Sequence, residues 1–178
     1  MFQLPKTSKN ARIARETGRV NKNSGQLRIS KDVNELDPPP SITVTIPNPD
    51  DLMNIYLALA PTEGYYADGL FRFTVTIPDD YPHSPPKVHC TTPVYHPNID
   101  LEGNVCLNIL RQDWKPVLTL NGVLYGLQLL FLEPNPDDPL NKEAADLLKT
   151  DKHAFRRNVD QSIRGGYVSG RFFPQSRR

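Results

Sequence analysis

Cys106 is the strongest candidate nucleophile in the sequence, and it lies in a segment without clear periodicity, residues 92–119. A cysteine in such a segment can expose its sulfur, and a thiolate attacks carbonyl carbons readily. The attack builds negative charge on the carbonyl oxygen, which a neutral amide donor can stabilise. Asn98 carries such an amide eight residues upstream, and Pro97 restricts the backbone beside it. Acyl transfer is one interpretation; the other is a small buried cysteine of the usual kind.

His96 has two possible roles at this site. It could act as a general base towards Cys106, or it could hold a tight turn through its ring nitrogens. The proline between His96 and Asn98 favours the structural role. A papain-like protease would need a second histidine far downstream, and the late histidine, His153, falls in an expected helix. The sequence therefore offers a nucleophile and an amide donor without a convincing histidine base.

Length and composition narrow the class of protein. The 178 residues suit one domain, and a net charge of +1 gives no general attraction to nucleic acid. Besides Cys106, only Cys90 is a cysteine, and it falls in an expected strand, so neither a disulfide framework nor a zinc site is expected. No apolar run approaches the length of a membrane span. We expect a protein without a metal in a reducing compartment, the cytoplasm or the nucleus.

The elements that must position these residues follow from proline and from apolar periodicity. Proline is excluded from helix interiors, so helices belong in the proline-free windows 6–37, 117–133 and 140–173. Apolar spacing predicts one helix over 24–36 and one that Asn121 caps. Two further helices are expected in the last window, over 141–148 and 152–163.

Alternating apolar residues predict strands between the first two helices. These strands are expected over 42–46, 55–59, 71–77 and 87–90. Short connections favour an antiparallel meander. The result is an α+β fold with an N-terminal helix, a four-stranded meander, a long active-site loop, and central and C-terminal helices.

The first 22 residues differ in charge from the remainder. They carry six basic side chains against Glu16, a net of +5, behind the apolar tip at residues 1–4. Their composition predicts a flexible arm on a core domain of residues 23–178. The arm is either an ordinary frayed terminus or a short docking peptide.

Four motifs have the order and spacing found in ubiquitin-conjugating enzymes, and the resemblance covers about residues 24–165. They are Tyr81-Pro82-His83-Ser84-Pro85-Pro86-Lys87-Val88, His96-Pro97-Asn98 with Gly103-Asn104-Val105-Cys106-Leu107, Trp114-Lys115-Pro116, and Pro134-Asn135-Pro136-Asp137-Asp138-Pro139-Leu140. Residues 98–111 and 132–145 most resemble the neddylation branch of the family, which handles a Nedd/Rub-type modifier. The resemblance implies the ubiquitin-conjugating fold.

The resemblance also implies a mechanism. Cys106 would take the modifier's C-terminal glycine from the activating enzyme as a thioester, and a substrate lysine would then attack the thioester carbonyl. Asn98 would donate to the oxyanion or hold the loop that does so, and Asp138 would orient the amine or accept its proton. Asp138 could otherwise be an ordinary turn carboxylate. No cofactor is expected, because the activating enzyme consumes the ATP.

Two further residues have expected places around this site. Asn108 stands where many ubiquitin-specific relatives carry aspartate. Trp114 is expected to be a core aromatic that shields the active-site loop.

The surfaces implied by the resemblance fall in two groups. A heterodimeric activating enzyme would contact Phe2 and Leu4 of the arm and Arg28 and Lys31 of the first helix. A RING-type ligase would contact His83, Pro116 and Val117, and a co-ligase would hold an acetylated Met1. Cullin-type substrates and a monomeric state are expected, without a nucleic-acid or membrane partner.

Three other functions remain as alternatives. One is a conjugating enzyme for ubiquitin itself. Another is a non-catalytic adaptor of the same fold, which the presence of both Cys106 and Asn98 disfavours. The last is a thiol hydrolase, which the lack of a histidine base disfavours.

Overall fold

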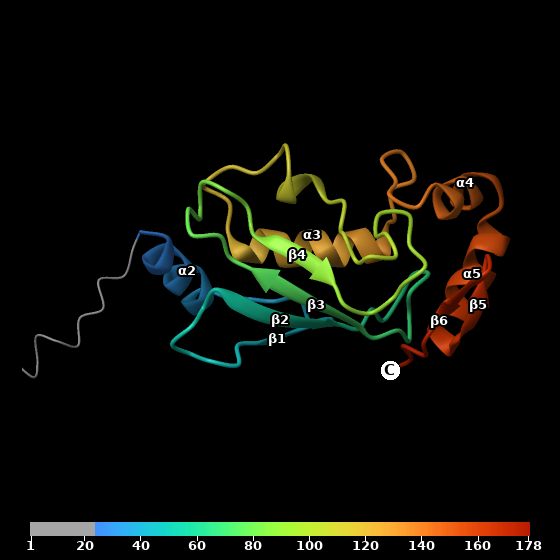
Figure 1. Ribbon diagram of the computed structural model, residues 1–178, viewed down its shortest axis with the longest axis horizontal. Helices are drawn as coiled ribbons and strands as arrows, with labels where there is room; N and C mark the ends of the chain where they lie inside the picture. Colours follow the sequence, from blue (N-terminus) through green and yellow to red (C-terminus); the bar gives the residue numbers. More distant parts are fainter. Residues whose placement is uncertain (1–23) are drawn as a thin grey trace, which may run out of the picture.

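A four-stranded antiparallel sheet forms one layer of residues 24–178, the part of the chain that the computed structural model describes (Figure 1). Its strands are β1 (Ile42–Thr45), β2 (Asn54–Leu59), β3 (Phe71–Thr76) and β4 (Lys87–Cys90). The order β1-β2-β3-β4 confirms the predicted meander. The expected arm, residues 1–22, lies outside the described residues.

The pairing of β2 with β3 explains why one face of the sheet is buried. Ile55 lies opposite Val75, and Leu57 lies opposite Phe73. All four side chains are almost fully buried. Since side chains alternate along a strand, this register directs the apolar set to one face.

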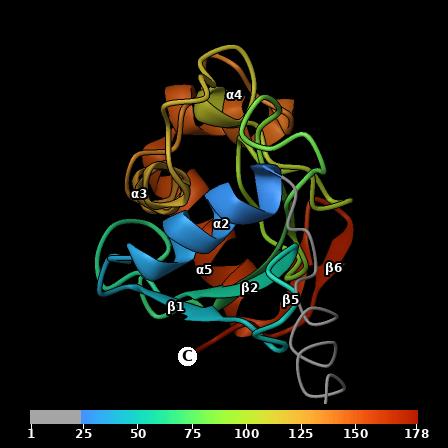
Figure 2. The same cartoon turned by 90° about the vertical axis from the view of Figure 1, so that its left-hand side faces the viewer.

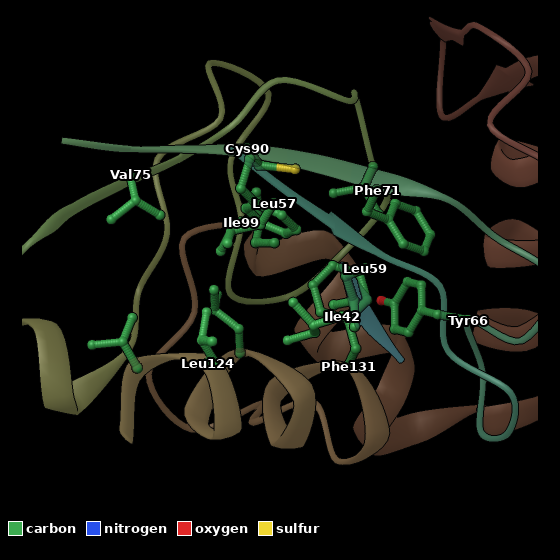
Figure 3. Packing of buried hydrophobic residues seen from close by; sticks show 14 of the residues in the cluster. Ile42, Leu57, Leu59, Tyr66, Phe71, Val75, Cys90, Ile99, Leu124 and Phe131 are labelled. Atoms are coloured by element: carbon green, nitrogen blue, oxygen red, sulfur yellow. The ribbon is translucent and has the colours of Figure 1, made fainter. Parts of the chain in front are cut away.

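Helix α3 (Leu120–Leu132) covers that face. Figure 3 shows Leu124 and Phe131 pointing from this helix towards the sheet residues Leu57 and Leu59. The apolar side chains at positions 120, 123, 124, 127 and 131 are buried, as their helical spacing predicts.

Asn121 does not cap this helix, so that prediction is wrong. The helix begins at Leu120, and its N-cap is Thr119, two residues before the predicted cap. The Asn121 side chain instead accepts a hydrogen bond from the backbone nitrogen of Asp37 at 2.9 Å and donates to the carbonyl of Glu35 at 2.8 Å. It thus joins α3 to the chain that follows the first helix.

The remaining helices lie at the two ends of the sheet. Helix α2 (Ser24–Asn34) lies at one end and is seen from that side in Figure 2. Helices α4 (Lys142–Thr150) and α5 (Lys152–Arg164) lie at the other end (Figure 1). Asn141 and Asp151 cap them by accepting hydrogen bonds from the third residue beyond, at 3.1 and 2.9 Å. No helix among residues 24–178 has the length and apolarity needed to cross a membrane.

A small hairpin after α5 was not predicted from the sequence. It consists of β5 (Gly166–Val168) and β6 (Arg171–Phe173). The φ angle of Gly165 is 90°, a conformation that favours glycine, and it turns the chain away from the helix. Phe173 is buried against the core, so the hairpin covers the edge of the domain near α5.

Candidate active site

Cys106 lies in a cleft of about 190 Å³ between the irregular segment, α3 and the loop that follows α3. The lining residues are Asn98, Cys106, Leu107, Asn108, Gly126, Leu129, Leu130, Glu133, Asn135 and Asp138. The structure therefore brings together four predicted site residues, at positions 98, 106, 108 and 138.

The backbone around Cys106 is held by a hydrogen bond and by a β-bridge. Its nitrogen donates to the carbonyl of Asn98 at 2.8 Å, and Ile99 pairs with Val105 in an isolated β-bridge. These bonds replace regular secondary structure in a segment whose only helix is the short 3₁₀ helix η1 (Asn108–Leu110). The backbone of Cys106 is consequently held against the Asn98 turn.

The Cys106 thiol donates to Oδ2 of Asp138 at 3.3 Å. Burial raises the pKa of this thiol above its ordinary value, and the hydrogen bond to Asp138 raises it further, whereas the nearby Arg111 cation opposes both effects. Only a thiolate attacks a carbonyl, so burial and the Asp138 hydrogen bond reduce the reactivity of Cys106, whereas Arg111 increases it.

Arg111 was not assigned a role from the sequence. Its Nη2 lies 2.7 Å from Oδ2 of Asp138, the same oxygen that accepts the Cys106 hydrogen bond. The two side chains of this ion pair are 45% and 57% exposed, so solvent weakens their attraction. A cation five residues after the candidate nucleophile was the only available signal.

Every polar atom of the Asn98 side chain is hydrogen-bonded to the loop after α3. Its Nδ2 donates to the carbonyl of Asn135 at 2.7 Å and to the carbonyl of Asp138 at 3.2 Å. Its Oδ1 accepts from the nitrogen of Asn135 at 2.9 Å. Of the two roles left open by the sequence, this arrangement is that of an amide which holds a loop.

The His96 ring is buried and both of its nitrogens are used within the fold. Nδ1 accepts from the nitrogen of Asn98 at 2.9 Å, so the proton resides on Nε2, which donates to the carbonyl of Leu130 at 3.0 Å. Burial lowers the pKa of His96 to about 3, which keeps the ring neutral. In this position the ring pins the turn, and the carbonyl of Pro97 accepts from Leu140 and Asn141 at 2.9 Å each.

Asn108 and Trp114 occupy different surroundings. Asn108 is exposed and lines the cleft at the start of η1. Trp114 lies outside the cleft lining and packs, partly buried, against the hydrophobic core. The Trp114 indole donates to the carbonyl of Pro82 at 2.8 Å, and its ring lies 5.9 Å from that of Tyr81.

The residues predicted to contact partner proteins differ in their exposure to solvent. His83, Pro116, Val117 and Lys31 are exposed. Arg28, expected to meet the activating enzyme, is partly buried, and its guanidinium makes hydrogen bonds within the chain. Met1, Phe2 and Leu4 lie outside the described residues.

Within residues 24–178, no cluster of three or more His, Cys, Asp and Glu side chains could hold a metal ion. Cys90 lies in the core (Figure 3), where burial raises the pKa of its thiol to about 12. Of the two cysteines, only Cys106 lines the cleft.

Comparison with known proteins agrees with this geometry. The family model described as "Ubiquitin-conjugating enzyme" matches residues 28–163. The chain is 57% identical over 150 residues to the Drosophila melanogaster "Nedd8-conjugating enzyme UbcE2M", covering 84% of this chain and 83% of that protein. It is 54% identical over 145 residues to the Schizosaccharomyces pombe "NEDD8-conjugating enzyme ubc12", covering 82% of each.

A solved structure gives the same result for the fold. The structure titled "S. cerevisiae Ubc12" is similar with a TM-score of 0.84 and 38% sequence identity, over 94% of each chain. The motifs around Cys106, the sheet-and-helix architecture and these matches together identify the chain as a member of the ubiquitin-conjugating enzyme family.

Proposed function

We propose that this protein is a NEDD8-conjugating enzyme that carries the modifier as a thioester on Cys106 and passes it to substrate lysines. The observation that supports this most directly is the Cys106 thiol in the cleft, 3.3 Å from a carboxylate oxygen of Asp138. The choice of modifier rests on relatives that carry this name and are 57% and 54% identical over most of the chain.

The first step is thiol–thioester exchange. The Cys106 thiolate attacks the carbonyl carbon that joins the modifier's C-terminal glycine to a cysteine of the activating enzyme. A new carbon–sulfur bond forms, the old one breaks, and the cysteine of the activating enzyme departs as a thiolate. The proton lost by Cys106 balances the one that the departing sulfur takes up. The exchange involves no oxidant or reductant.

The second step transfers the modifier to an amine. A substrate lysine attacks the same carbonyl carbon, an isopeptide bond forms, and Cys106 departs as a thiolate. A free lysine has a pKa of about 10.4, so the amine must lose a proton as it attacks. The Asp138 carboxylate lies beside the sulfur, which supports a role in orienting the amine or accepting that proton. Desolvation in the cleft would lower the pKa of the lysine and ease the step.

Asn98 supports both steps through the loop that carries Asp138. Its amide hydrogens hold the carbonyls of Asn135 and Asp138, so Asp138 stays beside Cys106. Direct donation to the oxyanion would require one of these bonds to open. We therefore assign Asn98 first to holding the loop.

The partners follow from the same assignment. The activating enzyme would engage Phe2 and Leu4 of the arm, together with Lys31 on α2. A RING-type ligase would engage the exposed residues His83 and Val117 with Pro116, and a co-ligase would engage Met1. Cullin-type scaffolds would be the substrates, and the reaction would take place in the cytoplasm and the nucleus.

The test is a charging assay with purified full-length protein, NEDD8, its activating enzyme and ATP. A thiol-sensitive adduct should form, and Cys106→Ser should convert it into an adduct that resists reductant. Cys90→Ser is the matched control and should charge normally, because Cys90 is buried in the core. If ubiquitin and its activating enzyme charge the protein and NEDD8 does not, the modifier assignment is wrong. If neither charges it, the enzyme assignment is wrong.

A further inference from the structure

A charged pair outside the cleft, Arg28 and Asp32 of α2, joins three segments of the chain. The Asp32 side chain is 1% exposed, and its Oδ1 lies 2.9 Å from Nε of Arg28. Its Oδ2 accepts from the Tyr81 hydroxyl and, at 3.2 Å, from the backbone nitrogen of Leu120. A carboxylate this deeply buried is stable only with such partners. The chemistry at Cys106 uses none of them.

The rest of the Arg28 guanidinium holds a backbone segment just before α3. Nη1 donates to the carbonyl of Pro116 at 2.6 Å, and Nη2 donates to the carbonyl of Leu118 at 2.5 Å. The guanidinium also lies over the Tyr81 ring, 5.7 Å from its centre. A planar cation with several fixed donors suits this task, because it can bind a carboxylate and two carbonyls at once.

The same segment is tied to the loop of Tyr81 by a second contact. The Trp114 indole donates to the carbonyl of Pro82 at 2.8 Å. The loops that contain His83 and Val117 are therefore joined directly through Trp114 and indirectly through Arg28. Val117 lies between the two carbonyls that Arg28 holds, and it is 78% exposed. The backbone at this position is fixed while the side chain remains available to a partner.

We propose that Arg28 is a positioning residue for ligase recognition, which holds residues 116–118 in the conformation that a RING-type ligase binds. This inference rests on the proposed function, because it takes these loops as the ligase surface. A loop that is already ordered loses less conformational entropy on binding, so fixing it improves affinity. Arg28 then acts on the ligase step and not as a contact of the activating enzyme.

Arg28→Lys in the full-length protein is the test variant. Lysine keeps a cation beside Asp32 but cannot hold both carbonyls at the same time. Lys152→Ala is the matched control, since it removes an exposed cation from α5, at the other end of the sheet. The probe is the isolated RING subunit of a cullin ligase. The rate at which the NEDD8 thioester is discharged onto free lysine is measured as the concentration of this subunit is raised.

We expect Arg28→Lys to raise the KM for the RING subunit about tenfold, with little change in kcat at saturation. The KM for the activating enzyme should change less than twofold, and Lys152→Ala should leave the KM for the RING subunit unchanged. Amide hydrogen exchange should accelerate at Leu118, whose nitrogen donates to the carbonyl of Lys115. A general loss of stability would lower Tm without raising the KM for the RING subunit selectively.

An unchanged KM for the RING subunit would overturn the proposal, as would an equal rise in the KM for the activating enzyme. If Arg28→Lys does not fold, Trp114→Phe replaces it, because phenylalanine keeps an aromatic ring and removes the donor to Pro82. That variant should also raise the KM for the RING subunit, and an unchanged value would overturn the proposal. Failure of the wild-type protein to charge with NEDD8 would instead reject the proposed function.

Discussion

Arg111 and Cys106 meet at one oxygen atom of Asp138. Oδ2 lies 2.7 Å from Nη2 of Arg111 and accepts the Cys106 thiol hydrogen bond at 3.3 Å. Burial raises the pKa of the thiol, the carboxylate raises it further, and the guanidinium lowers it. The reactivity of Cys106 therefore depends on two opposite charges from different segments of the chain.

Asp138→Asn should have opposite effects on the acidity of the Cys106 thiol and on the rate of transfer to lysine. Removing the negative charge lowers the pKa of Cys106, so alkylation of Cys106 by iodoacetamide at neutral pH should become faster. Discharge of the NEDD8 thioester onto lysine should slow about a hundredfold, because the amine loses its carboxylate partner. The rates are measured in a Cys90→Ser background so that Cys106 is the labelled thiol. Slower alkylation would contradict this electrostatic account.

Arg111→Gln should have the opposite effect on the thiol. Without the cation the pKa of Cys106 rises, and the thiolate fraction at pH 7 falls. Charging should slow about fivefold at pH 7, since exposed ion pairs are weak, and it should recover as the pH is raised. Arg111→Lys, which keeps the charge, is the control. A defect of equal size at every pH would mean that Arg111 acts sterically.

Asn98→Ala tests whether the amide acts through the loop. It removes three hydrogen bonds to Asn135 and Asp138, and it should lower the free energy of unfolding by about 1–3 kcal/mol in urea titrations. Backbone exchange over residues 134–139 should accelerate while lysine discharge slows. Slow discharge with unchanged exchange in that loop would instead favour direct donation to the oxyanion.

His96 should make stability fall as the solution becomes acidic. Its pKa is about 3 in the folded protein and about 6.5 in an unfolded chain, so the unfolded state binds more protons between these values. The contribution is almost complete at pH 7.5, about one unit above the unfolded pKa, and about 2 kcal/mol of it is lost between pH 7.5 and pH 5. Urea unfolding at both pH values measures the loss, and His96→Gln should reduce it by that amount. An equal pH dependence in the two proteins would contradict the buried neutral ring.

Removal of residues 1–22 should slow charging while the core remains folded. The arm carries a net charge of +5 and an apolar tip, and both can contribute to docking on the activating enzyme. The rate of thioester formation is compared at low and high salt, together with Tm. Replacing Phe2 and Leu4 by alanine in the intact chain separates the tip from the charge. Equal charging rates for the full and shortened chains would reject the docking arm.

Much of the fold was predictable because its signals are local. Proline cannot enter a helix interior, so the proline-free windows located α2, α3, α4 and α5. Alternation of apolar residues located the strands, since successive side chains point to opposite faces of a sheet. The hairpin β5–β6 escaped prediction because its strands have only three residues each, too few to display a period.

The sequence by itself identified Cys106, Asn98 and Asp138 as candidates through residue type and motif spacing. Only the tertiary structure decided what each side chain contacts. Asn98 reaches the loop 37 to 40 residues away, and Arg28 reaches carbonyls 88 and 90 residues away. Those separations in sequence are bridged by tertiary packing, in which α2 contacts α3, so no local pattern encodes them. The sequence determined which groups are present, and the packed core determined which of them share a hydrogen bond.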